Sequence, residues 1–155
     1  MSNIGPHLTS WRRRKLPGFE IVPLVSAGGV AFGSPVGEVR NHFGTSFHSF
    51  QRVHGVGYPS DHFETIGVFA YYDVAGRLAA MEFAAREARV LLDGMDLASL
   101  NLGEALSHFA SQQPRHHDGL EVRALQIGLW FPDEKEYGDR AHCKTVLAGA
   151  PGYYG

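Results

Sequence analysis

Histidines and acidic residues are the side chains of this sequence that could do chemistry together, and that chemistry would be metal binding. The chain has nine histidines in 155 residues, and imidazole and carboxylate groups both bind divalent transition metals. Structural zinc usually needs closely spaced Cys and His pairs, and neither HExxH nor CxxC occurs. We therefore expect no metal and no cofactor; a small enzyme or metal-dependent protein that uses His-rich loops is the alternative. The candidate ligands are His48, His54, Asp61 and His62 in the first half, and His116, His117, Asp118 and His142 in the second.

The single cysteine, Cys143, could act as a nucleophile if a base lay beside it. His142 precedes it directly and would point to the opposite face of a strand. We therefore interpret Cys143 as a buried structural residue. The sequence also has no G-x-S-x-G, Walker or post-strand G-x-G-x-x-G motif, so we expect a protein without enzymatic activity.

Carboxylates and aromatic residues gather near the C-terminus, in PDEKEYGD at residues 132–139 and just before it. A charged turn explains such a run, and no apolar pocket is predicted that would prepare a catalytic acid. Next to aromatic side chains, however, the acids could form a surface that binds a basic protein. Tyr71 and Tyr72 are consecutive on a predicted strand, so an outward-facing Tyr71 would extend this surface. The predicted partner-binding residues are Tyr71, Trp130, Asp133, Glu134, Glu136 and Tyr137.

Charge is unevenly distributed along the chain. The net charge is −2, yet the run RRRK at residues 12–15 holds four of the 14 basic residues, and no acid precedes Glu20. Residues 16–155 therefore have a net charge of −6, which repels nucleic acid and attracts a basic protein. We expect a basic protein partner and no nucleic acid, and we interpret RRRK as a solvated segment. No apolar run is long enough for a membrane span, and the lone cysteine suits a reducing cytoplasm.

The pattern of elements predicts an α+β fold, with a curved, mainly antiparallel sheet and two short helices packed on it. We expect a flexible basic arm over residues 1–18, a single domain over residues 19–149 and a flexible tail over residues 150–155. Two apolar runs around the turn at residues 73–76 predict a hairpin in which Gly76 is left-handed. Alternating apolar residues over 120–131 predict one strand.

An octapeptide occurs twice, as VGEVRNHF at residues 36–43 and LGEALSHF at residues 102–109. Apolar residues at helical spacing predict a helix in each copy. The first helix has Ser34 as the expected N-cap and Gly44 as the stop, and Asn101 with Glu104 predicts a capping box for the second. The glycine of each copy is expected to allow close approach to the sheet, and each histidine to interact with its helix dipole. The repeat favours two related halves.

The segment GVAFGSPVGEVRNHFG, residues 29–44, resembles a signature of small bacterial units of the SmpA/BamE and β-lactamase-inhibitor-protein type. More loosely, the order of elements over residues 19–110 resembles that of small bacterial immunity-like proteins. These resemblances imply helices on an antiparallel sheet and a function exerted by binding other proteins, with no catalytic residues. The chain lacks the signal and lipobox cysteine of the lipoprotein members, so an envelope role is not implied.

Together, these observations predict a cytoplasmic, non-enzymatic binding protein. The expected role is that of an immunity protein, which neutralises a basic toxin through an acidic aromatic surface. Besides the metal-dependent alternative above, a subunit of a larger complex would use the same surface.

Overall fold

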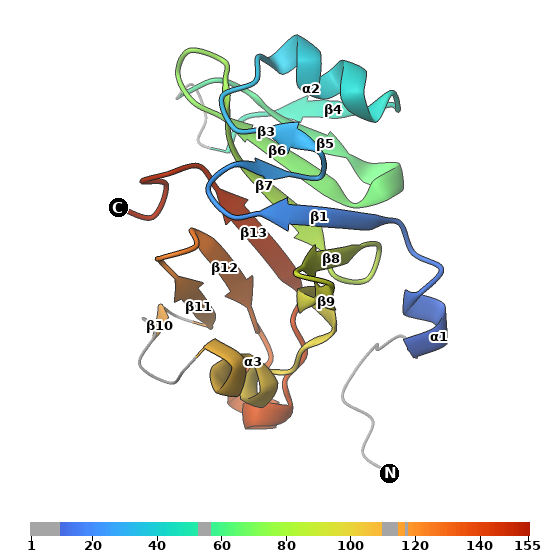
Figure 1. The fold of residues 1–155 in the computed structure, drawn as a ribbon, viewed down its shortest axis with the longest axis vertical. Coiled ribbons are helices and arrows are strands. Elements are labelled where there is room, and N and C mark those ends of the chain that lie inside the picture. The colour runs from blue at the N-terminus through green and yellow to red at the C-terminus, as the bar shows by residue number, and fades with distance from the viewer. Residues whose placement is uncertain (1–9, 53–56, 110–114, 117) are drawn as a thin grey trace.

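Two β-sheets make up the architecture, and one continuous apolar core lies between them (Figure 1). The computed structural model describes residues 10–52, 57–109, 115, 116 and 118–155. Its elements confirm the predicted α+β class with mostly antiparallel strands. The idea of two related halves stays a prediction. No helix in the described part of the chain combines the length and the apolar character that a membrane crossing requires.

The larger sheet has eight strands, and each neighbouring pair is antiparallel. Its central hairpin is the predicted one, and Gly76 in the connecting turn is left-handed with φ 74°. In spatial order the strands are β10 (Arg115–His116), β11 (Gly119–Val122), β12 (Ile127–Trp130), β13 (Thr145–Gly149), β7 (Leu78–Ala84), β6 (Val68–Tyr72), β5 (Ser60–Phe63) and β4 (His48–Phe50).

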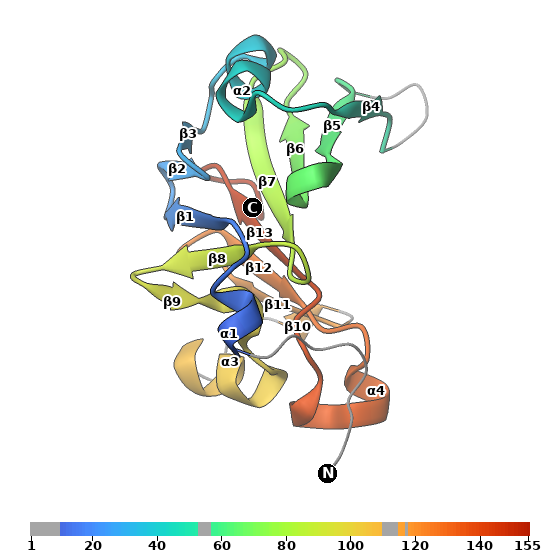
Figure 2. The ribbon, with the colours of Figure 1, turned by 90° about the vertical axis from the view of Figure 1, so that its right-hand side faces the viewer.

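The smaller sheet has five strands and covers one face of the larger sheet (Figure 2). Phe19 stacks on Phe83 of the larger sheet with ring centroids 5.4 Å apart, which joins the two layers. In spatial order the strands are β3 (Val30–Ala31), β2 (Ser26–Ala27), β1 (Gly18–Val22), β8 (Arg89–Leu92) and β9 (Met95–Asp96), with β1 parallel to β8.

The helices are short and lie at the edges of the two sheets (Figures 1 and 2). They are α1 (Ser10–Arg13), α2 (Val36–Phe43), α3 (Leu102–Phe109) and α4 (Glu134–Tyr137), with 3₁₀ turns η1 (Glu64–Ile66), η2 (Leu97–Ser99) and η3 (Gly138–Arg140).

Both copies of the repeated octapeptide are helices, and α2 and α3 have the bounds of the repeat itself. The capping box predicted for α3 is confirmed. Asn101 Oδ1 accepts a hydrogen bond from Glu104 N at 2.8 Å, and Glu104 Oε1 accepts one from Asn101 N at 3.0 Å. Side chains therefore satisfy Glu104 N in the first turn and Asn101 N at the cap, while Leu102 N donates to Ala141 O at 2.9 Å.

The start of α2 differs from the prediction. Pro35 rather than Ser34 is the N-cap residue, and Ser34 Oγ donates backwards to Ala31 O at 2.7 Å. Gly44 ends the helix in the left-handed conformation, as predicted. The space next to Gly37 is open, so close approach to the sheet does not explain that glycine.

Residues 120–131 form a hairpin, and the single strand predicted there is wrong. The turn at residues 123–126 separates β11 from β12, and Gln126 adopts the left-handed conformation with φ 54°. Apolar residues continue to alternate through the turn, so the sequence does not reveal where β11 ends and β12 begins. The charged turn predicted at residues 132–139 contains α4 and η3.

The basic arm is attached to the body at Arg13, which is 7% exposed. Its guanidinium donates to Asp96 Oδ2 at 2.8 Å, to Ala85 O at 2.6 Å and to Ala88 O at 2.9 Å. The expectation of a solvated basic run is therefore wrong for Arg13, whereas Arg14 is exposed.

Candidate functional site

The candidate site lies on the face of the larger sheet that points away from the smaller one, here called the open face. On β7, Met81 and Phe83 point into the core, so Glu82 between them points to the open face. Neighbouring strands continue this arrangement through their register. One row of cross-strand neighbours on the open face runs through His62, Phe69, Glu82, Leu147, Gly128 and Glu121.

The C-terminal residues lie on this face and help to build the site. Tyr154 N donates to Gln126 Oε1 at 2.6 Å, which fixes the end of the chain over β12. A Cβ atom at Gly128 would overlap the Tyr154 hydroxyl, and one at Gly149 would be 2.6 Å from Tyr153 Cβ. These two glycines therefore leave the space in which the tyrosines sit. The flexibility expected for residues 150–155 stays a prediction, but their position here is against the sheet.

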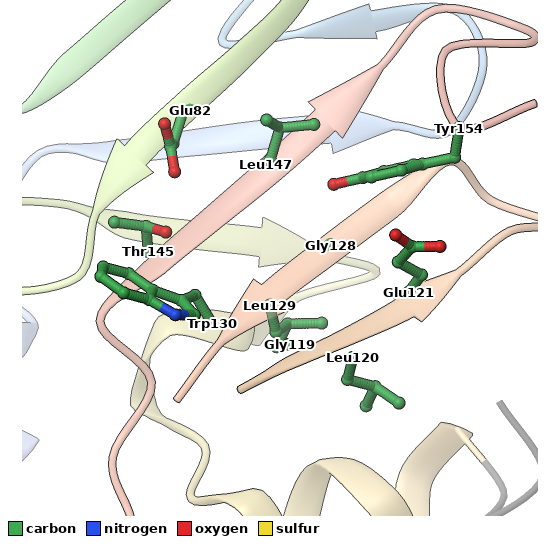
Figure 3. Close-up of a pocket in the computed structure, with 10 residues that line it drawn as sticks. All are labelled: Glu82, Gly119, Leu120, Glu121, Gly128, Leu129, Trp130, Thr145, Leu147 and Tyr154. Carbon is green, nitrogen blue, oxygen red and sulfur yellow. The ribbon is translucent and has the colours of Figure 1, made fainter. Parts of the chain in front are cut away.

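A hollow of about 140 Å³ opens between the tail and the strands (Figure 3). Its walls carry the carboxylates of Glu82 and Glu121 and the rings of Trp130 and Tyr154. Leu147 supplies an apolar floor. We call this hollow the acidic aromatic pocket, and its charge and rings suit a cationic group.

Hydrogen bonding holds Glu82 in place within the pocket. The Tyr71 hydroxyl donates to Glu82 Oε1 at 2.5 Å. Burial, together with the charge of Glu82, raises the pKa of Tyr71 above its ordinary value. Burial likewise raises the pKa of Tyr154. Both phenols therefore stay neutral at physiological pH, and the carboxylates give the pocket its negative charge.

The rim of the pocket already contacts two basic side chains. Arg123 Nε donates to Glu121 Oε2 at 3.1 Å, and Lys144 Nζ lies 5.7 Å from the centroid of the Trp130 ring. Both basic residues are exposed, and Trp130 itself is 42% exposed. Such surface pairs are weak and exchange readily with solvent, so an incoming cation can compete with them.

The predicted partner-binding residues are divided between two places. Trp130 lines the acidic aromatic pocket. Tyr71 does not line it but donates a hydrogen bond to Glu82, which does. Tyr71 is 8% exposed, so the expectation of an exposed Tyr71 is wrong. The remaining four lie at α4, at the end of the molecule away from β6 (Figure 2). These four are Asp133, Glu134, Glu136 and Tyr137.

Sequence reasoning missed three of the residues that form the pocket: Glu82, Glu121 and Tyr154. A signal for Glu82 was present, since it is the one charged residue in the apolar strand LAAMEFA. Tyr154 gave no such signal, because nothing local indicates that a Gly-rich end returns to the sheet.

Three of the candidate metal ligands have other partners. His48 Nε2 lies 2.5 Å from Glu64 Oε1, the His62 ring stacks on Phe69 at 4.0 Å, and Asp61 is bonded to Arg40. Across the described residues, His, Cys, Asp and Glu form no cluster of three or more that could hold a metal ion. His54 and His117 lie outside the described residues. The other candidates, His116, Asp118 and His142, lie in or beside β10, β11 and the segment before β13.

Cys143 is buried, as predicted, just before β13. Burial raises the pKa of its thiol to about 12. The thiol therefore stays protonated at physiological pH and donates to Thr145 O at 3.2 Å, which does not suit a nucleophile.

Comparison of the chain with known protein families, curated proteins and solved structures finds no match. The resemblance to small bacterial binding units therefore stays a prediction. Fold and site define an α+β protein of two packed sheets, with an acidic aromatic pocket on the open face of the larger one.

Proposed function

We propose that this chain is a protein-binding domain that holds a basic partner on its open face, with one Lys or Arg side chain in the acidic aromatic pocket. The observation that carries the proposal is the convergence of two carboxylates and two aromatic rings on one hollow. At about 140 Å³, the hollow is smaller than the roughly 300–1,000 Å³ typical of small-molecule sites. A single long side chain is the better match.

The chemistry of the pocket supports a cation in two ways. A Lys or Arg head group can pair with Glu82 or with Glu121, and it can lie against the Trp130 ring in a cation–π contact worth about 0.5–2 kcal/mol. The methylene stem of the same side chain can cover Leu147. The net charge of −6 over residues 16–155 would in addition attract a basic partner from a distance.

Within this class, we propose the role of a cytoplasmic immunity protein that neutralises a basic toxin. The acidic face and the lack of catalytic motifs support this role. A subunit of a larger complex would dock its basic neighbour on the same face. No observation in the described residues favours the metal-dependent alternative.

The first test is a titration of the protein with a lysine hexapeptide and with an arginine hexapeptide. Binding is measured by Trp130 fluorescence and by calorimetry. We compare wild type with E82Q/E121Q, which removes two charges while keeping the shape of both side chains. Because each lost charge weakens the pairing with the cation, we expect at least tenfold weaker binding. A glutamate hexapeptide should not bind.

The matched control is D133N/E136Q, which removes two charges from the α4 region where the sequence placed the site. Binding within about twofold of wild type is expected for this variant. If both double variants lose affinity for the peptides equally, net charge alone explains the effect. If D133N/E136Q loses more affinity than E82Q/E121Q, the binding site is at α4. Binding unchanged in both would contradict recognition by charge.

A further inference from the structure

A second pocket lies where Arg52, residues at the ends of β5 and β6, and the C-terminal Tyr153 come together. It has a volume of about 360 Å³, which is within the range of small-molecule sites. Four tyrosines are among the residues that line it, Tyr58, Tyr71, Tyr72 and Tyr153, together with the small Ala79. We call it the tyrosine pocket.

Arg52 is the one charged residue among the described residues that line the tyrosine pocket. Its guanidinium carbon lies 4.1 Å from the centroid of the Tyr71 ring, and Nη1 donates to Tyr153 Oη at 3.2 Å. Among the described residues, Arg52 forms no ion pair with a carboxylate. A guanidinium that stacks on a ring keeps its in-plane N–H groups free to bind an anion. Arg52 is therefore held in position by Tyr71 and Tyr153 and still has N–H groups that can bind a ligand.

The tyrosines around Arg52 differ in what they can offer a ligand. Tyr71 and Tyr72 use their hydroxyls to bond Glu82 and Asp61, so their rings serve as walls. Tyr58 is 42% exposed, its ring lies edge-on to Tyr72 at 5.9 Å, and its hydroxyl has no hydrogen-bond partner among the described residues. Tyr58 can therefore both cover a flat ligand and bond to it.

We propose that the tyrosine pocket binds a small planar aromatic acid, with its carboxylate on Arg52 and its ring between the tyrosine rings. The two parts of the ligand match the two features of the pocket. The guanidinium supplies paired donors for a carboxylate, and aromatic walls favour a ring in offset or edge-on packing. Glu82 lines the acidic aromatic pocket and not this one, but its charge acts on Arg52, so the ligand carboxylate binds Arg52 in competition with it. This site is independent of the proposed protein binding.

The experiment measures binding of four probes to the whole protein by calorimetry and by amide shifts in NMR spectra. Benzoate carries ring and charge, acetate the charge alone, benzyl alcohol the ring alone, and benzylammonium the ring with the opposite charge. Saturable binding of benzoate, at least tenfold tighter than each of the other three, is the expected result. The amides of Tyr58 and Ala79 should show the largest shifts.

Variants then test the role of Arg52. R52M should bind benzoate at least tenfold more weakly, because methionine keeps the bulk of the side chain and lacks its N–H donors. R52K keeps the charge but lacks the paired N–H donors of the guanidinium, so its affinity should be intermediate. The control R123M, at the rim of the acidic aromatic pocket, should bind within twofold of wild type. Unchanged binding in R52M, acetate binding as tight as benzoate, or tighter binding of benzylammonium would each overturn the proposal. If R52M does not fold, the probe series on wild type decides alone.

Discussion

Asp61 is a fully buried carboxylate that joins α2 to the larger sheet. Arg40 donates to both of its oxygens, at 2.8 and 3.0 Å, and Ser49 Oγ and Tyr72 Oη each donate at 2.8 Å. Burial alone would raise the pKa of Asp61, but the hydrogen bonds from Arg40, Tyr72 and Ser49 outweigh it and lower the pKa below its ordinary value. The residue is thus charged in the folded protein and fully occupied as an acceptor.

We predict that R40M destabilises the protein by about 2–3 kcal/mol at pH 7, since it leaves a buried charge without its counterion. The figure is below that for a fully buried pair because the Arg40 side chain is 35% exposed. A lowered folded pKa gives stability above the unfolded pKa of about 3.9, and this stability is lost as the pH falls below it. Urea unfolding at pH 7, 4.5 and 3.5 should show the gap between wild type and R40M closing at the lowest pH.

A double-mutant cycle checks that the effect belongs to the pair. In the background of D61N the carboxylate is absent, so R40M should cost less than about 1 kcal/mol. If R40M costs the same with and without the D61N change, the loss comes from the contact of the Arg40 guanidinium with Phe47, in which its carbon lies 4.4 Å from the ring centroid.

The two repeat helices share a sequence pattern but differ in how they begin. Asn101 caps α3 in a reciprocal pair with Glu104, whereas Ser34 turns away from the start of α2. Both histidines are exposed and pack edge-on against the phenylalanine that follows, but His42 Nε2 in addition lies 2.9 Å from Gly28 O. Local pattern therefore predicted the helices, while their ends depended on neighbours that the pattern does not contain.

These different starts predict different costs for similar changes. N101A should lower the free energy of unfolding by about 1 kcal/mol, because it removes the acceptor that satisfies an amide in the first turn. S34A serves as the control and should stay within about 0.5 kcal/mol of wild type, since Ser34 makes no cap hydrogen bond. Chemical denaturation of both variants measures the difference; a loss in S34A equal to that in N101A would contradict the assignment of Pro35 as the cap.

Strand positions were predicted best where a typical turn residue, such as glycine, separates two strands in the sequence. Gly76 marked a real turn, and the strands around it formed. Gln126 takes the left-handed conformation without being a glycine, so the alternating pattern ran through the turn and β11 and β12 were read as one strand. The prediction failed where tertiary contacts, here Gln126 with the C-terminal Tyr154, overrode local preference.

Across the whole molecule, the sequence predicted the fold class but not the pocket. Glu82 and Glu121 line one hollow because β7, β13, β12 and β11 are neighbours in a fixed register. No local pattern encodes that order, so the sequence pointed to the acids of α4, which are merely adjacent along the chain. Trp130 was found because it is both aromatic and beside that acidic run.

The arm before β1 also depends on long-range contacts. Arg13 makes them with its side chain, and the carbonyl oxygens of Leu16 and Pro17 accept hydrogen bonds from Arg89. R13M should lower the free energy of unfolding by about 3 kcal/mol, because it leaves Asp96 and two buried carbonyls without their donor. For a chain of this size that loss corresponds to a drop in Tm of roughly 6–12 °C, which calorimetry measures. R14M, with the same change at an exposed position, should stay within about 0.5 kcal/mol of wild type. Removal of residues 1–16 should cost more than R13M, because it also removes Leu16 O, which accepts from Arg89 Nε at 3.1 Å. A loss in R14M equal to that in R13M would contradict the anchor.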